Sequence, residues 1–226
     1  MTSSEANSVH AMWATRLASV LALRDDANIQ SPRWRKTRAE LRRGASPATE
    51  HYAYPHVLPY ADPTLSDHQI TSLVRLFALV AEFDQVPHYR PSNTTDTNGQ
   101  KKIRRVGHWA RQVSIAQAKK TGEQFQANPD DLDSVGQRLQ FIYSLDAEEA
   151  ILNVSRILKI ATALPGPIPA LDYYDLFRTF LYWGNGFTPA SQNIRRRMLR
   201  DYFSYFAEIP ETSSNTDNDN KDNATT

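Results

Sequence analysis

Residues 66–80, which read SDHQITSLVRLFALV, decide the fold class of this chain. Ser66 and Gln69 have the spacing of a capping box, in which two side chains satisfy backbone groups at a helix start. The apolar residues after them recur every three or four positions, as one buried face of a helix requires. They are Ile70, Leu73, Val74, Phe77 and Val80. The stretch therefore predicts an amphipathic helix.

Cap and break signals on both sides predict further helices. Serine before proline at Ser31-Pro32 is typical of a helix start, and Gly44 stands where the same helix should end. The other expected starts are near Ser8, Arg104, Pro129, Asp146, Asp172 and Thr188. Glycine is scarce, with eight residues, and no segment has the alternation of a strand. We therefore expect an all-α fold.

The helices divide most naturally into two small helical bundles joined by a short linker. We expect an N-terminal bundle over residues 1–121, with a basic helix and a mobile loop at 85–102, and a C-terminal bundle over residues 129–208. A single bundle is the alternative. From residue 211 onward the chain has no large apolar side chain, so we expect residues 209–226 to form a disordered acidic tail.

The composition excludes several classes of protein and site. The chain has no cysteine, which rules out disulfides, thiolate nucleophiles and cysteine-bound metal centres. No apolar run approaches the roughly 18–20 residues that cross a bilayer, and residues 1–9 lack the pattern of a secretory signal. We therefore expect no membrane partner and a cytoplasmic location.

The positive charge is concentrated, although the net charge of the chain is only +1. Residues 33–44 hold six basic residues and one acidic residue, residues 101–120 hold seven basic residues, and residues 195–200 hold four. The last two segments contain no acid. Cations this crowded repel one another, and a polyanion such as nucleic acid is their usual partner. Solvated helix faces paired to acids elsewhere in the fold are the alternative.

Helical geometry places most of these cations on outer faces. In the second expected helix, Arg35, Arg38 and Arg42 form a ridge beside the buried side, and Lys36 and Arg43 point away from the core. Arginines at one-turn spacing suit phosphates along a strand. The predicted nucleic-acid-binding residues are Arg33, Arg35, Lys36, Arg38, Arg42, Arg43, Lys101, Lys102, Arg104, Arg105, Arg111, Lys119, Lys120, Arg196, Arg197 and Arg200.

The remaining large side chains divide between the surface and the interior. Arg104 and Arg111 should share the outer side opposite Trp109. Arg195 instead faces an apolar arc and should form a buried structural ion pair. The tryptophans Trp34, Trp109 and Trp183 occupy core-facing positions. These four side chains, Arg195 and the tryptophans, are therefore interpreted as structural.

No combination of residues predicts catalysis. The six histidines show no zinc-binding helix pattern, and His51 and His56, in a proline-rich connector, are a weak metal signal. The chain also lacks a phosphate-binding glycine loop and a nucleophile elbow. We expect no catalytic residue, no metal and no cofactor. The connector tyrosines Tyr52, Tyr54 and Tyr60 either stack on nucleobases or pack locally.

Short motifs follow one another in order along residues 34–206. They begin with residues 38–44, RAELRRG, and continue with Tyr54-Pro55, residues 76–78 and Gly107. Arg138, residues 145–149, Asp172-Tyr173, Trp183, Arg197 and residues 201–203 complete the set. The ordered set resembles the CasB family, the small subunit of the type I-E CRISPR Cascade complex.

The resemblance implies an all-α fold of two small bundles and a non-catalytic role in RNA-guided surveillance. It implies that two copies of the protein lie together among other Cascade subunits. The implied nucleic-acid partners are the crRNA, the target DNA and the displaced single-stranded DNA. Base pairing then reads the sequence, so the protein needs phosphate contacts rather than contacts to base edges.

Other functions fit the charge pattern less well. A stand-alone helical DNA-binding regulator would need two short helices joined by a tight turn, whereas the basic helix ends at Gly44 and runs into a proline-rich connector. A nuclease would need specific metal-binding carboxylates. A purely protein-binding scaffold would use the basic faces as its interface.

Overall fold

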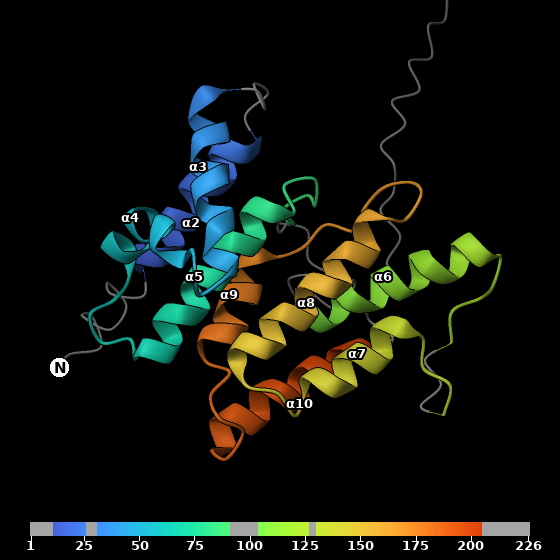
Figure 1. Ribbon diagram of the computed structural model, residues 1–226. Coiled ribbons are helices and arrows are strands. Elements are labelled where there is room, and N and C mark those ends of the chain that lie inside the picture. The colour runs from blue at the N-terminus through green and yellow to red at the C-terminus, as the bar shows by residue number, and fades with distance from the viewer. Residues whose placement is uncertain (1–10, 26–30, 91–103, 127–129, 205–226) are drawn as a thin grey trace, which may run out of the picture.

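A computed structural model describes residues 11–25, 31–90, 104–126 and 130–204 (Figure 1). Within these ranges the regular elements are helices, and one isolated bridge joins His88 to Leu171. The α-helices are α2 (Ala11–Asp25), α3 (Pro32–Arg42), α4 (Tyr54–Val57), α5 (Asp67–Glu82), α6 (Val106–Thr121), α7 (Ser134–Ile142), α8 (Ala147–Thr162), α9 (Tyr173–Leu181) and α10 (Pro189–Phe203). The all-α prediction is confirmed.

Three short 3-10 helices fill the connector between α3 and α5. They are η1 (Arg43–Ala45), η2 (Glu50–Tyr52) and η3 (Leu58–Tyr60). The expected mobile loop lies mostly outside the described residues, and the acidic tail and the start near Ser8 lie outside them entirely. None of the described helices is both long and apolar enough to cross a membrane.

Most helix starts follow the cap signals in the sequence. The Ser31 hydroxyl accepts a hydrogen bond from the Trp34 N–H at 3.1 Å, and Ser66 and Gln69 form the predicted capping box. The predicted caps of α8, α9 and α10 also bond backbone N–H groups through their side chains. The start of α7 differs, because Asp133 rather than a residue near Pro129 caps that helix.

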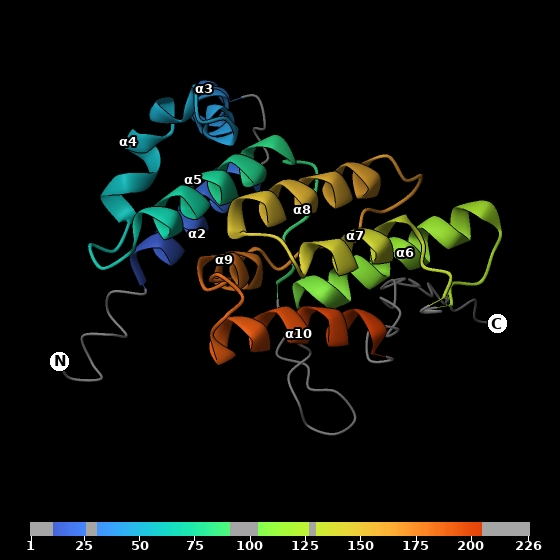
Figure 2. The same ribbon diagram turned by 60° about the horizontal axis from the view of Figure 1, so that its bottom comes forward.

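Helix α5 is the central element, and α3, α8 and α9 pack against it (Figures 1 and 2). Every side chain from Ser72 to Ala81 is buried, as expected for a helix that is covered on all sides. The core is one continuous cluster that extends from α2 to α10. It includes Trp34, Trp109 and Trp183, whose predicted core positions are confirmed.

Gly44 has a different role from the predicted one. Helix α3 ends at Arg42, and Gly44 lies inside η1 without the positive φ of a glycine helix cap. A Cβ atom at this position would lie 2.9 Å from Val74 Cγ1 and 3.2 Å from the Val74 carbonyl oxygen. Glycine is therefore needed for the close packing of η1 against α5.

Helix α6 packs lengthwise against α10 and also contacts α7. The approach to α10 depends on Gly107, because a Cβ atom there would lie 2.1 Å from the Met198 carbonyl oxygen. The division into bundles at residues 1–121 and 129–208 stays a prediction. The packing nevertheless joins α6, which that division assigns to the N-terminal bundle, to two helices of the C-terminal one.

Candidate nucleic-acid interface

Three of the predicted cations project from α3 into solvent. Arg33, Arg35 and Lys36 are exposed, and their side chains form no hydrogen bond or ion pair within the described part of the chain. The buried face of the same helix is formed by Trp34, Thr37 and Leu41. Packing of that face turns the three cations, here termed the outer α3 cations, away from the core.

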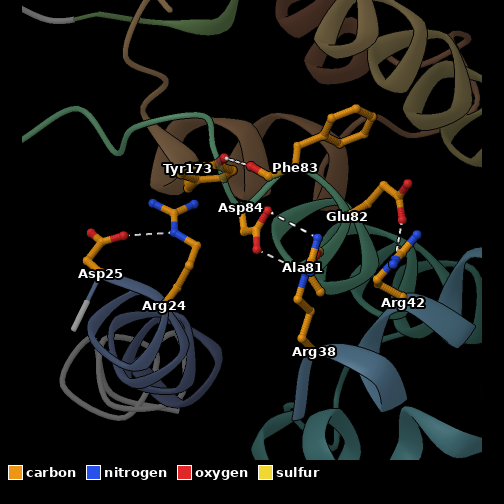
Figure 3. Close-up of polar contacts among 9 residues, drawn as sticks. All are labelled: Arg24, Asp25, Arg38, Arg42, Ala81, Glu82, Phe83, Asp84 and Tyr173. Carbon is orange, nitrogen blue, oxygen red and sulfur yellow. Dashed lines mark hydrogen bonds and ion pairs between the residues drawn. The ribbon is translucent and has the colours of Figure 1, made fainter. Parts of the chain in front are cut away.

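The other two arginines of the predicted ridge are bound to the end of α5 (Figure 3). The Arg38 side chain donates to the Ala81 carbonyl oxygen at 3.0 Å, and its Nε lies 3.0 Å from Asp84 Oδ2. Arg42 forms an ion pair with Glu82. Arg38 and Arg42 are each about a third to a half exposed, at 35% and 45% of the side chain. The ridge is thus divided between free and paired arginines.

The sequence left two roles open for the connector tyrosines, stacking on nucleobases or packing within the protein, and the structure contains both exposed and packed tyrosines there. Tyr54 donates a hydrogen bond to Glu50 at 2.6 Å, and Tyr60 lies 5.1 Å below the guanidinium of Arg16 from α2, so both side chains have partners within the fold. Tyr52 is 44% exposed, and the predicted cation Arg43 lies over its ring at 4.1 Å.

The connector histidines make separate contacts. His56 Nε2 lies 2.6 Å from Glu40, while the His51 ring lies 4.2 Å from the Tyr52 ring. Among the described residues, no group of three or more His, Asp and Glu side chains is arranged to hold a metal ion.

The predicted cations of α6 have three different environments. Lys119 and Lys120 are exposed at the helix end, whereas Arg104 covers the Tyr89 ring at 4.6 Å and Arg105 pairs with Asp201 at 3.3 Å. Lys101 and Lys102 lie outside the described residues. Helix α6 therefore presents two free lysines, both in its last turn.

Arg111 is not on the outer surface where the helical pattern placed it. It is 4% exposed, donates to the Tyr202 carbonyl oxygen at 3.2 Å and lies over the Phe125 ring. The reason is that α7 and α10 both pack against α6, which leaves only a narrow arc of that helix in contact with solvent. Periodicity within one helix does not show how many neighbours cover it.

Helix α10 carries a second exposed basic surface. Arg196 and Arg200 line a pocket together with Asn193 and Leu199. Arg197 is half-buried, and its charge lies near the carboxylate of Asp175. Burial raises the pKa of Asp175, and the backbone N–H of Val106, which bonds this carboxylate at 3.0 Å, opposes that rise.

Arg195 is buried, as predicted, but its partners are carbonyl oxygens rather than an acid. Its guanidinium donates to the carbonyl oxygens of Leu145 at 2.9 Å and Gly184 at 3.0 Å, and to that of Tyr143. It also lies over the Trp183 ring at 4.6 Å. This side chain joins the ends of α7 and α9 to α10.

Sequence reasoning missed a buried arginine in α2. Arg24 is 3% exposed, bonds Asp25 at 2.8 Å and lies over the Tyr173 ring (Figure 3). Burial raises the pKa of Tyr173 to about 12, so its hydroxyl stays protonated and lies 3.3 Å from the Val86 carbonyl oxygen. No local signal identifies such a residue, because its ring partner is nearly 150 positions away in the sequence.

The two exposed basic surfaces lie far apart. Helices α3 and α10 are on opposite sides of the molecule in both views (Figures 1 and 2). The outer α3 cations and the Arg196–Arg200 surface are therefore two separate sites of positive charge rather than one patch.

Similar folds occur among solved structures. CasB from Thermus thermophilus superimposes with a TM-score of 0.54 at 17% identity, over 84% of this chain and 97% of that one. A chain of a CRISPR RNA-guided surveillance complex gives 0.53 at 18% identity, over 86% and 92% of the two chains. A chain of such a complex in a pre-nicking state gives 0.53 at 21% identity, over 85% and 92%. These likenesses establish the fold.

A family model provides the evidence on ancestry. No curated protein sequence matches the chain. The model of CRISPR-associated protein Cse2 matches residues 37–203, which is well over half of the 226-residue chain. That match agrees with the resemblance to CasB seen in the sequence motifs. The chain therefore belongs to the CRISPR-associated protein Cse2 family, a family of non-catalytic Cascade subunits.

Proposed function

We propose that this protein is a nucleic-acid-binding subunit of an RNA-guided CRISPR surveillance complex, in which it holds strands by phosphate contacts that do not depend on sequence. The strands are the crRNA, the target DNA and the displaced single-stranded DNA. Family membership supports its place among other Cascade subunits. The resemblance in the sequence motifs implies a second copy beside it. Exchange of a DNA duplex for an RNA–DNA hybrid is nearly balanced in energy, so modest backbone contacts are enough to favour the open state.

One observation carries the proposal. On a single helix, Arg38 and Arg42 are bound to acids at and just after the end of α5, while Arg33, Arg35 and Lys36 have no such partner in the described structure. Arginine side chains fork onto phosphate, which suits this role.

The arrangement of helices argues against the stand-alone regulator. A helix–turn–helix requires a second helix after a turn of three or four residues. Here six residues separate the end of α2 from the start of α3, and α3 is followed by η1, η2, the four-residue α4 and η3 before α5 begins. The basic helix is therefore not presented as a recognition helix of that type.

Fluorescence anisotropy across a salt series tests the proposal. Two unrelated single-stranded DNAs, one single-stranded RNA and one duplex are titrated with wild-type protein and with the variant R33Q/R35Q/K36Q. Each lost phosphate contact should make the log–log salt slope on a single strand less steep by about 0.7, or about two for the triple variant. The two single-stranded DNAs should bind alike.

A charge-matched variant provides the control. R156Q/K159Q/R178Q removes three exposed cations from α8 and α9 and should leave the salt slope within about 0.7 of wild type. Equal losses in the two variants would mean that only net charge matters. Preferential binding of one duplex sequence would replace the proposal with the regulator. Absence of binding at low salt would indicate that the basic faces contact protein.

A further inference from the structure

An exposed cluster of aromatic and cationic side chains lies where α3 meets the connector. The Arg43 guanidinium lies over the Tyr52 ring at 4.1 Å, and the His51 ring lies 4.2 Å from the Tyr52 ring at an interplanar angle of 35°. All three side chains are exposed. We define these residues as the Arg43–Tyr52–His51 cluster.

The backbone below this cluster is firmly anchored. The Thr49 hydroxyl donates to the Arg43 carbonyl oxygen at 2.8 Å and so joins η1 to the start of η2. The buried Arg75 donates to the Gly44 carbonyl oxygen and forms an ion pair with Glu50 at 2.7 Å. The planar groups are therefore held at the surface before any ligand binds, which lowers the entropic cost of binding.

The charge around the cluster favours an anionic ligand. Arg43 continues the helical path of α3, with φ −64° and ψ −20°, and follows Lys36 by seven residues, or two turns. The free ammonium of Lys36 therefore lies on the same side of the helix as the cluster. The acid nearest to the cluster tyrosine in the sequence, Glu50, is already occupied by Arg75 and Tyr54.

A ligand that fits must have a flat apolar ring and a negative charge about two helical turns away. Two helical turns span roughly 11 Å, which is within reach of the phosphates that flank an unpaired nucleotide. Bases stack on aromatic rings and on guanidinium planes without regard to sequence. A paired base inside a duplex does not expose its ring face, so the cluster selects unpaired nucleotides.

We propose that the Arg43–Tyr52–His51 cluster is a stacking site for an unpaired nucleobase of a bound single strand, DNA or RNA. The proposal rests on the proposed function and adds to it a contact with the base itself. It assigns Tyr52 and His51 to binding, a role that charge alone does not indicate. The site recognises the ring face and leaves the base edges unread, so it is consistent with binding of any sequence.

The test separates stacking from phosphate contact by removing bases from the ligand. Three ten-residue strands are used: a mixed-sequence DNA, the matching RNA and a DNA in which every residue is abasic. Wild-type protein, Y52L and the conservative variant Y52F are titrated with each strand by anisotropy across a salt series. Y182L, which removes another exposed tyrosine at the end of α9, is the control.

The stacking site predicts a selective loss. Y52L should bind base-containing strands about five-fold or more weakly, since one stacked base contributes about 1 kcal/mol or more. Its binding to the abasic strand and its salt slope should match wild type, because no charge changes. Y52F and Y182L should bind every strand as wild type does. A loss confined to DNA or to RNA supports the site and identifies the strand that it holds.

Two results would overturn the inference while leaving the proposed function intact. They are an equal loss by Y52L on the abasic strand, or undiminished binding of Y52L to both base-containing strands. The proposed function fails separately if wild-type protein shows no salt-dependent binding to any strand, and the stacking site then fails with it. Quenching of a 2-aminopurine base in the DNA by wild type and Y52F, but not by Y52L, provides an independent readout.

Discussion

The arginines of α3 and those around the α6–α10 contact have opposite roles, although both groups come from basic segments of similar appearance. On α3, most cations remain at the surface, either free or paired to acids at and just after the end of α5. At the α6–α10 contact, Arg111 and Arg195 are buried and bond carbonyl oxygens. The difference teaches that the number of neighbouring helices, rather than local charge density, decides whether an arginine stays exposed at the surface or stabilises the fold.

The largest expected effect on stability is at Arg195, whose role at the α6–α10 contact is purely structural. R195L removes the donor from the part-buried carbonyl oxygens of Tyr143 and Gly184, at about 1–3 kcal/mol for each group, while the Leu145 oxygen keeps its hydrogen bond from Trp183 Nε1. We expect the free energy of unfolding to fall by about 3 kcal/mol or more, as measured by urea denaturation. The adjacent, exposed Arg196 provides the control, and R196L should change stability by about 0.5 kcal/mol or less. Similar values for the two variants would contradict the assigned role.

A second prediction concerns the close approach of α6 and α10. Helix propensity favours G107A by about 1 kcal/mol, but packing opposes it, since the new Cβ would lie 2.1 Å from the backbone oxygen of Met198. We expect a net loss of about 1–3 kcal/mol in thermal or urea denaturation. In G136A the new Cβ would lie 2.8 Å from the side-chain hydroxyl of Tyr202 rather than from backbone, so the loss of stability should be smaller. Stabilisation by G107A would show that the two helices can separate freely.

The contrast between free and paired arginines can be tested by removing the acidic partners of the paired ones. In E82Q/D84N, Arg38 and Arg42 lose their acidic partners and become available to phosphate. We expect tighter single-strand binding and a salt slope steeper by up to about 1.4, for two added contacts. Because both pairs are partly exposed, stability should fall by only about 1 kcal/mol. D131N/E149Q, with the same charge change at two exposed acids away from α3, should leave the slope closer to wild type.

The smallest expected effect is the pH dependence from Asp175 of α9, whose carboxylate bonds the first residue of α6. Burial raises the pKa of this carboxyl above its usual 3.8, so between 3.8 and the raised value the folded protein binds more protons than the unfolded chain. In that window the free energy of unfolding decreases as pH rises. D175N should remove this part of the slope, as followed by urea denaturation between pH 3.5 and pH 7 at about half-unit steps. An unchanged slope would locate the pH dependence at other buried acids.

The helices and much of the core could be predicted from the sequence. The cap residues Ser31, Ser66 and Thr188 each bond a backbone N–H three positions away, so the local sequence is enough to predict their effect. Trp34 and Trp109 were placed correctly because one apolar face per helix is enough to orient them, and Trp183, which follows the end of α9, is buried as predicted. The family resemblance likewise depends only on residue identities in a fixed order, and the family match confirms it.

Whether each cation is exposed, paired or buried could not be predicted in the same way. Arg38 and Asp84 are 46 positions apart, and Arg111 and the Tyr202 carbonyl group that it bonds are 91 apart. Helical periodicity identifies the side of a helix that is apolar, but it does not identify which other helix covers the remaining sides. For the same reason Gly44 could be predicted at a helix end, while its contact with Val74 could not.

The sequence by itself determined that this protein is helical, that it lacks thiol chemistry and that its positive charge lies in three segments, because these properties depend on residue identity and short-range spacing. Only the tertiary structure decided which cations are free. It paired Arg38 and Arg42 to α5, buried Arg111 and Arg195, and left Arg33, Arg35 and Lys36 exposed on α3. The physical reason is that a guanidinium takes the strongest acceptor within reach, and packing of distant segments sets which acceptors are within reach.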